Sequence, residues 1–356
     1  MRRSHVAWSR VLAALAISVL AAVAAALELH FVDVGQGDAV VIVAPDGRAV
    51  VYDGGPAADT LYTYLRRVGI EQVVLVIASH AHADHIGGLP AVIDAYVPAF
   101  VLDNGVPHTT RAFERYLHAV ERSGAQLLTP ERRTITLGEV RLHVLPSPGR
   151  PEWGHNDNSV GLVVEYGAFR ATLTGDAEAQ LFEWWLATVP EMLVDVQVHK
   201  ASHHGSDEGD TRAALIGLRP ELVVVSARAG NRYGHPHESA LARYAEVGAA
   251  LLRTDLHGTV RIEVEEDGSY RVTTERSAPA PTAEPARAAA SAPSACIDLN
   301  EAGLAALELI VHIGHERAAA IAGLRPFTTV EQRSRVDGIG PARLRDIVEQ
   351  GLACVR

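Results

Sequence analysis

The sequence predicts a chain of mixed α/β (α+β) class, sheet-rich over residues 27–275 and all-helical over residues 296–356. Short β-branched runs such as 73–77 alternate with amphipathic helical patterns such as 60–68, which is typical of sheets covered by helices. The composition then changes to alanine, proline and serine over residues 276–295, which predicts a linker. Helical patterns broken twice by glycine follow this linker.

Length and composition set broad bounds on the protein. A chain of 356 residues suits two domains at a prior of about 150 residues each, and 48% hydrophobic residues permit a sizeable core. The net charge of −11 opposes a wide basic surface of the kind that attracts nucleic acid. DNA stays a candidate partner because metal ions in a cleft and a local basic patch also attract phosphate.

The N-terminus has the pattern of a secretory signal peptide over residues 1–26. Arg2, Arg3 and Arg10 precede an apolar run over 11–26 that ends in small residues. This run is shorter than the roughly 20 residues that a membrane span needs. We therefore expect export to the cell surface, periplasm or medium, with no integral membrane domain in the mature chain. An uncleaved N-terminal anchor is the alternative.

The elements of the sheet-rich region can be assigned in order. Strands are expected at 29–34, 39–43, 49–52, 73–77, 132–137, 140–145, 160–166, 170–174, 193–198, 222–226, 260–264 and 270–273. Residues 45–48 form a hairpin turn between the second and third of them. Helices are expected at 60–68, 89–95 and 111–123.

A cluster of metal-ligand side chains follows the strand over 73–77. His80, His82, Asp84 and His85 fall within six residues, where side chains leaving a strand end can be bent around a common point. Imidazole and carboxylate are the ligands that zinc or manganese accepts in an open catalytic site. Unrelated core and surface histidines are the alternative reading of the same residues.

A second carboxylate, Asp176, follows another predicted strand. It comes directly after Thr174 and Gly175, and the glycine frees the backbone to turn the side chain toward a metal. A carboxylate in this position is well placed to bridge two cations.

The segment 80–85 resembles the HxHxDH signature of the metallo-β-lactamase superfamily. Further motifs in the same order resemble the branch that includes the hydrolase domain of ComEC/Rec2 competence proteins. They are Phe31–Ala39, Asp53–Gly55, Asn156–Ser159, Thr174–Asp176, Lys200–Ser206 and Asn231–Pro236. The resemblance, over residues 28–274, implies a four-layer αββα fold and a hydrolytic site for two divalent metal ions, zinc or alternatively manganese.

The resemblance also implies roles for individual residues. Asp176 takes the place of the bridging ligand, and Asp53 that of a carboxylate that orients a ligand histidine, although an ordinary turn residue is the alternative. His203 is expected as the distal ligand of the second metal, with His204 lining the pocket or contacting phosphate. Asn158 stands where most members have a histidine loop and is expected to support a ligand.

Four further assignments complete the predicted site. His155 lies near the usual ligand position by count, so it is either a metal ligand or a loop histidine. Lys200 is expected at the mouth of the site or as an ordinary strand lysine. His235 suits protonation of a leaving group or phosphate binding near neutral pH, or a structural role in a turn. Asp84 is expected both to bind metal and to accept a proton.

The C-terminal region resembles the tandem helix-hairpin-helix module of competence DNA receptors. Gly338, Ile339 and Gly340 match its hairpin, which implies phosphate binding by backbone N–H groups. His312 replaces the corresponding first glycine in the other hairpin, which puts phosphate binding there in doubt. Docking of a protein partner, or a purely structural role, is the alternative for this region.

Local patterns in the C-terminal region predict its elements. Asn300 is expected to cap a helix over 301–310, and further helices are expected over 315–324, over 328–335 and after Pro341. Cys296 and Cys354 flank the region, and a disulfide between them would suit an exported protein. Two independent buried thiols are the alternative.

These features together predict an exported metal-dependent hydrolase. The favoured activity is that of a phosphodiesterase or nuclease that attacks DNA with water activated between two metal ions. The alternatives are a hydrolase of a small phosphodiester, ester or lactone, and a non-catalytic accessory protein of DNA uptake.

Overall fold

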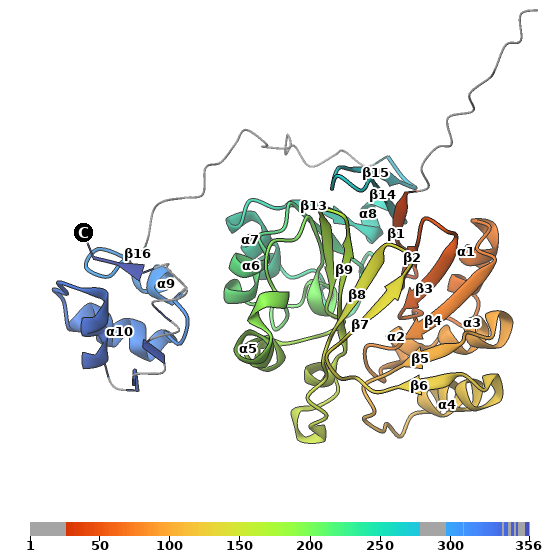
Figure 1. The fold of residues 1–356 in the computed structure, drawn as a ribbon, viewed down its shortest axis with the longest axis horizontal. Coiled ribbons are helices and arrows are strands. Elements are labelled where there is room, and N and C mark those ends of the chain that lie inside the picture. The colour runs from red at the N-terminus through yellow and green to blue at the C-terminus, as the bar shows by residue number, and fades with distance from the viewer. Residues whose placement is uncertain are drawn as a thin grey trace, which may run out of the picture.

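The computed structural model describes residues 26–277 and, with short gaps, residues 297–355. Two mixed β-sheets pack face to face, with helices on both outer faces (Figure 1). The predicted signal peptide, apart from Ala26, lies outside the described residues, as do Cys296 and nearly all of the predicted linker.

The first sheet has eight strands in the order β15-β14-β1-β2-β3-β4-β5-β6. Its strands are β1 (Leu27–Phe31), β2 (Val40–Val43), β3 (Arg48–Tyr52), β4 (Gln72–Ile77), β5 (Phe100–Leu102), β6 (Gln126–Leu128), β14 (Val260–Val264) and β15 (Tyr270–Thr274). Strands β2 and β3 form the predicted hairpin, and β3 to β6 run parallel.

The second sheet has seven strands in the order β13-β12-β11-β10-β9-β8-β7. These are β7 (Arg133–Leu137), β8 (Val140–Leu145), β9 (Gly161–Tyr166), β10 (Phe169–Leu173), β11 (Val198–Lys200), β12 (Leu222–Val225) and β13 (Ala250–Arg253). Strands β7 to β10 pair antiparallel, and β10 to β13 run parallel.

Helices cover the outer face of each sheet. The first sheet carries α1 (Thr60–Arg67), α3 (Leu89–Tyr96) and α4 (Arg111–Ser123), and the second carries α5 (Ala179–Thr188), α6 (Arg212–Leu218) and α7 (Glu238–Glu246). Short α2 (Ala83–Ile86) and α8 (Thr254–His257) lie in loops. Among the described residues, no helix has the length and apolar character needed to cross a membrane.

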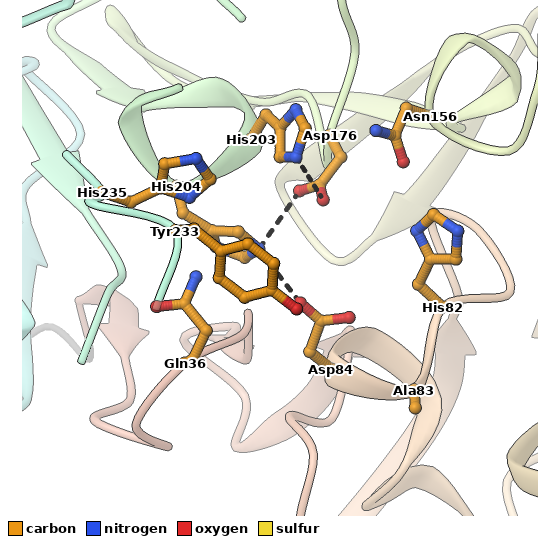
Figure 2. Close-up of a pocket in the computed structure, with 10 residues that line it drawn as sticks. All are labelled: Gln36, His82, Ala83, Asp84, Asn156, Asp176, His203, His204, Tyr233 and His235. Atoms are coloured by element: carbon orange, nitrogen blue, oxygen red, sulfur yellow. Dashed lines mark ion pairs between the residues drawn. The ribbon is translucent and has the colours of Figure 1, made fainter. Parts of the chain in front are cut away.

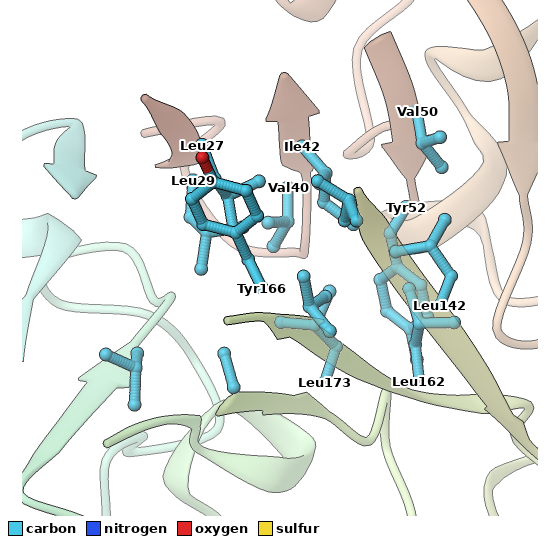
Figure 3. Close-up of a cluster of buried hydrophobic side chains, with 14 of the residues drawn as sticks. Leu27, Leu29, Val40, Ile42, Val50, Tyr52, Leu142, Leu162, Tyr166 and Leu173 are labelled. Atoms are coloured by element: carbon cyan, nitrogen blue, oxygen red, sulfur yellow. The ribbon is translucent and has the colours of Figure 1, made fainter. Parts of the chain in front are cut away.

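The largest core cluster lies between the two sheets. Leu29, Val40 and Tyr52 of the first sheet and Leu142 and Leu173 of the second belong to this one buried cluster (Figure 3). Separate clusters join each sheet to its own helices. The layers are therefore helix, sheet, sheet and helix, which is consistent with the predicted αββα sandwich.

Most predicted elements of the sandwich are present, and one is wrong. The helix over 111–123 and the strand over 140–145 are confirmed at their bounds. The strand expected over 193–198 is absent, because residues 193–197 are irregular and link 3-10 helix η3 (Pro190–Met192) to strand β11 (Val198–Lys200). Asp195 between them has a φ of 44°, a backbone conformation that a strand does not allow.

The C-terminal region differs from the all-helical prediction. Strands β16 (Ile297–Asp298) and β17 (Ala353–Cys354) pair in parallel. The helices include α9 (Leu304–Leu307), α10 (His315–Gly323) and 3-10 helix η5 (Val330–Arg335). Asn300 caps no helix over 301–310, because its side chain donates to the carbonyl of Phe327 and accepts from its N–H.

Candidate metal centre

The loops that carry the predicted ligands meet at one edge of the sandwich. The metal loop follows the carboxyl end of β4, and the loops of Asp176 and His204 follow those of β10 and β11. In parallel strands the carboxyl ends share an edge, and each of these loops directly follows the carboxyl end of its strand. Asp38 and Ser159 reach this edge too, since each precedes a strand that pairs antiparallel with its neighbour.

His85 is held by a carboxylate behind it. Its Nδ1 lies 2.8 Å from Oδ2 of Asp53, and both residues are fully buried. Ser79 donates its backbone N–H and its hydroxyl to the same carboxylate at 2.7 Å and 2.8 Å. This is the arrangement that the predicted orienting role of Asp53 requires, and it turns Nε2 of His85 toward the pocket.

His204 is held in the same manner by a second carboxylate, Asp38. Nδ1 of His204 lies 3.1 Å from Oδ1 of Asp38 and 3.1 Å from the carbonyl of Ser226. The other carboxylate oxygen of Asp38 lies 2.5 Å from Nζ of Lys200. Two acceptors at Nδ1 hold a proton there, so Nε2 of His204 also faces the pocket and is the atom that can bind a metal ion once it has lost its own proton.

Asp84 and Asp176 complete the cluster (Figure 2). Asp84 Oδ2 lies 3.4 Å from Nε2 of His204, and Asp176 Oδ1 lies 3.5 Å from the same nitrogen. The other oxygen of Asp176 lies 3.2 Å from Nε2 of His85 and 3.8 Å from Nε2 of His80. The two oxygens of Asp176 thus face different groups, as a bridging carboxylate must.

Unpaired buried atoms indicate that this cluster suits metal ions. Nε2 of His85, Nε2 of His204 and Oδ1 of Asp176 are buried without a hydrogen-bond partner. Such atoms are costly to bury unless something binds them. Among the described residues, five groups have ligand atoms within 4.8 Å of one another, and two of these face the pocket directly, namely His80, His85 and Asp176, and Asp84, His85 and His204.

The electrostatics agree with a site built for cations. Burial opposes ionisation of Asp176, but His204 and His85 outweigh it and hold the pKa of this carboxyl well below its usual range. Burial likewise opposes the charge of His204, yet Asp176 and Asp38 raise its pKa to about 9. In the absence of metal, protons on the imidazoles therefore partly balance the buried carboxylates.

The sequence matches the family described as the metallo-beta-lactamase superfamily over residues 32–227. This chain belongs to the metallo-beta-lactamase superfamily. The metal-ligand cluster at the edge of its two sheets agrees with that membership, and the chain is a metallo-beta-lactamase-type hydrolase with a His/Asp metal-binding cluster.

Within the superfamily the chain is related to competence proteins. It is 28% identical to ComE operon protein 3 of Bacillus subtilis over 66% of this chain and 32% of that one. It is 26% identical to Recombination protein 2 of Haemophilus influenzae over 67% of this chain and 29% of that one. The chain therefore spans about a third of the length of these relatives.

A third relative is similar over a shorter stretch. A protein of Thioalkalivibrio sp. named Deoxyribonuclease is 43% identical over 60 residues, which cover 17% of each chain.

The structure of this superfamily member places both His203 and His204 near Asp176, in different surroundings, and their predicted roles stay predictions. His204, not His203, lies with Asp84 and His85. Nδ1 of His203 lies 3.2 Å from Glu178 and its Nε2 is 3.8 Å from Asp176. The two residues have left-handed φ values of 47° and 57°, and this tight turn sends the second ring inward.

His82, one of the predicted ligands, belongs to none of these groups of described residues. Nε2 of His80 lies 2.9 Å from Nδ1 of His82, so this pair is hydrogen-bonded in the structure. The ring of His155 lies 5.4 Å from that of His82 and 4.2 Å from that of His108. His155 is in none of the described clusters with Asp176, which favours the loop-histidine alternative.

Lys200 lies on β11, in agreement with the strand-lysine alternative, and His235 lies at the pocket. Lys200 is 1% exposed and pairs with Asp38, so it does not reach the mouth of the site. His235 lines the pocket. Burial and the neighbouring His204 lower the pKa of His235 to about 4, so its ring is neutral near pH 7 and is not an imidazolium proton donor.

Asn158 holds the backbone of its own loop rather than a ligand. Its side chain donates to the carbonyls of Arg150 and Gly154 and accepts from the N–H of Arg150. Ser159 is the residue nearer the cluster, since its hydroxyl accepts from the N–H of Asp176 at 3.3 Å and lies 3.5 Å from Nδ1 of His80.

The hairpin residues of the C-terminal region show a repeated local geometry. Gly338 has a φ of 82° and its carbonyl accepts from Arg343. His312 has a φ of 65° and its carbonyl accepts from Arg317, also five residues on. Ile339 is buried in the core of this region. The second half of the predicted disulfide, Cys354, lies on β17 beside Asp298, but the pairing with Cys296 stays a prediction.

Sequence reasoning missed several residues of the site. Asp38, Ser79 and Ser159 contact ligand side chains, and Gln36 and Tyr233 line the pocket. The available signal for Asp38 was a carboxylate placed directly before the apolar strand β2. A charge in that position is expensive to bury unless it has a partner.

Proposed function

We propose that this chain is an exported, metal-dependent phosphodiesterase that acts on DNA. The observation that carries the proposal is the convergence of unpaired buried atoms from His85, Asp176 and His204 on one pocket beside Asp84. Export rests on the leader pattern of the sequence.

The residues of the pocket have distinct tasks in this reaction. Divalent ions held by the cluster would supply Lewis acidity and a water of lowered pKa. Asp84 is partly open to the pocket. Its pKa lies well below the usual range, because His204 and His85 outweigh the effect of burial. Asp84 is therefore an acceptor that orients the attacking water by hydrogen bonding.

DNA is favoured over a small substrate for two reasons. The cavity measures about 270 Å³, which is below the roughly 300–1,000 Å³ of pockets that enclose drug-sized ligands. Such a cavity suits one phosphate group of a longer molecule that extends outside it. In addition, the relatives include competence proteins and a protein named Deoxyribonuclease, and the C-terminal region resembles a DNA-binding hairpin module.

The decisive experiment measures cleavage of single- and double-stranded DNA by residues 27–356 after chelation and reloading with Zn²⁺ or Mn²⁺. Asp84→Asn keeps the size of the side chain and removes a ligand charge. Asp94→Asn is the matched control, since this exposed carboxylate pairs only with Arg122 on the surface. We expect cutting that requires metal and falls at least about 100-fold in Asp84→Asn, with Asp94→Asn close to wild type.

Failure to cut either DNA at full metal loading would refute the proposal. Bis-p-nitrophenyl phosphate, a lactone and a thioester would then identify which other hydrolysis the cluster performs. Salt-dependent DNA binding without turnover of any substrate would instead support an accessory protein.

A further inference from the structure

Tyr233 is a large aromatic side chain left open beside the metal-ligand cluster. It is 47% exposed, and it lines the same pocket as Asp84 and Asp176. Figure 2 shows its ring in front of the pocket, with Gln36 and Asp84 nearby. An exposed ring costs free energy in water, so a ring at the mouth of a polar site is a candidate contact for a planar ligand group.

The loop that carries Tyr233 is held in place by its own hydrogen bonds. The side-chain oxygen of Asn231 accepts from the N–H groups of Tyr233 and His235, each at 3.1 Å. The amide of Asn231 donates to the carbonyls of Arg228 and His235. Nε2 of His237 lies 3.0 Å from the carbonyl of Tyr233. The ring is therefore positioned before a ligand arrives, which reduces the ordering cost of binding.

Planar cationic and aromatic groups surround the ring of Tyr233. The imidazole of His235 stacks on it with centroids 5.6 Å apart and an angle of 23°. The guanidinium carbon of Arg232 lies 4.7 Å from the ring centroid, and Arg232 also donates to the Tyr233 hydroxyl. Because the hydroxyl already has a partner, the exposed part of the ring that His235 and Arg232 leave open is the part that can contact a ligand.

Gln36 adds a hydrogen-bond donor to the lining of the same pocket. Its oxygen accepts from the N–H of Arg228 at 3.3 Å, while its buried Nε2 has no hydrogen-bond partner. A donor that is buried without a partner favours a ligand with an acceptor oxygen at this place. Phosphate oxygens and nucleobase carbonyls both meet that requirement.

We propose that Tyr233, with Arg232 beside it, stacks on an unpaired nucleobase next to the phosphate held in the pocket. This inference rests on the proposed function and adds to it a preference for single-stranded over double-stranded DNA. The cavity of about 270 Å³ leaves the base outside, at the mouth where Tyr233 lies. A paired base inside a duplex has both faces covered, so the contact selects single-stranded or frayed DNA.

The test compares two single strands of equal length and charge. One is oligothymidylate, and the other is an abasic tetrahydrofuran oligomer that has the phosphodiesters without the bases. We expect wild type to show a kcat/KM about tenfold higher for oligothymidylate, because base stacking on an aromatic side chain contributes this much or more. Tyr233→Leu should lose the preference mainly through KM, and Tyr233→Phe should keep it.

Tyr62→Leu is the matched control, since Tyr62 lies on α1 and does not line the pocket. Loss of the preference in Tyr233→Phe as well would assign the effect to the hydroxyl and overturn the stacking proposal. Equal preference in wild type and Tyr233→Leu would overturn it too, while leaving DNA cleavage by wild type intact.

A binding measurement separates this inference from the proposed function. The metal-free protein is titrated into an oligomer that contains 2-aminopurine, whose fluorescence falls when the base stacks. Quenching by wild type and Tyr233→Phe, but not by Tyr233→Leu, supports the contact even if no DNA is cut. Equal quenching by all three proteins, or no quenching by wild type, overturns it.

Discussion

The imidazoles of the cluster depend on two buried carboxylates, Asp53 behind His85 and Asp38 behind His204. We expect Asp38→Asn and Asp53→Asn each to weaken metal binding by about 10–100-fold, because carboxylates behind ligand histidines fix ring orientation and basicity. Competition with a chelating dye measures the affinity. Asp46→Asn, an exposed turn carboxylate, should leave it unchanged. Unaltered affinity in Asp38→Asn would show that His204 does not need this partner.

The ion pair of Lys200 and Asp38 makes a second prediction about single residues. Both side chains are almost completely buried. Lys200→Met therefore leaves the Asp38 carboxylate buried without its cationic partner, which should lower the free energy of unfolding by about 3–5 kcal/mol. The double variant Asp38→Asn/Lys200→Met removes both charges and should recover part of this loss. Denaturant unfolding of the metal-free wild type, the two single variants and the double variant measures this double-mutant cycle. If the two single losses of unfolding free energy simply added up in the double variant, the pairing would be contradicted.

The raised pKa of His204 sets a pH dependence for the metal-free protein. Its ordinary value is 6.5 and its folded value is about 9. This imidazolium therefore contributes stability that is complete below about pH 6.5 and is lost as pH rises through about 9. Metal binds the neutral ring, so binding at pH 7 should release a proton and strengthen toward pH 9.

Calorimetry of metal binding at pH 7 in two buffers of different ionisation enthalpy counts the released protons. Identical heats in both buffers would mean that the imidazoles are already neutral.

At the scale of elements, the metal loop depends on close backbone contact with the loop before β2. A Cβ added at Gly37 would lie 2.2 Å from the carbonyl oxygen of Asp84, and Gly37 has a φ of 139°. We expect Gly37→Ala to destabilise the protein by about 2 kcal/mol or more and to weaken metal binding. Gly47→Ala is the control, because Gly47 also has a positive φ but nothing lies near its added Cβ. The denaturation midpoints of the two variants measure their stabilities.

The sequence identifies elements well where local pattern decides them. The metal loop after β4 and the helix α4 follow from periodicity and ligand spacing. The choice between His203 and His204 depends on a left-handed turn that adjacent, chemically identical residues do not reveal. The choice between the two expectations for Lys200 depends on its partner Asp38, which is 162 residues away in sequence, in the loop before β2.

The C-terminal prediction failed where a long-range contact replaced a local one. Asn300 has the residue type of a helix cap, yet its amide pairs with the backbone of Phe327. Strands β16 and β17 are each two residues long, which is too short for an alternating pattern to predict them.

At the scale of the whole molecule, the C-terminal region should affect long substrates more than short ones. Gly340→Glu places a negative charge at the hairpin, where an added Cβ meets no atom within 4 Å. We expect DNA binding several-fold weaker and less steeply salt-dependent, with unchanged turnover of bis-p-nitrophenyl phosphate. Gly303→Glu is the control, because an added Cβ at Gly303 is equally unhindered and Gly303 lies outside the hairpins that contain His312 and Gly338.

Gly314→Glu extends this comparison to the hairpin that contains His312. Filter binding over a range of salt concentrations should leave Gly314→Glu close to wild type if only the second hairpin holds phosphate. Equal weakening by all three glutamates would indicate general repulsion instead of a hairpin site.

The strand β14 has a consequence for how this sandwich can be combined with other chain segments. It pairs with β1 on one side and β15 on the other, so the first and last strands of the sandwich are separated by a single strand. Leu27 lies opposite Val264 and Thr274 opposite Val260, which places the two ends about 16 Å apart. A domain with adjacent ends can be spliced into a longer polypeptide or circularly permuted without disturbing its catalytic edge. The sandwich therefore has the end geometry of a domain that can be inserted into other proteins.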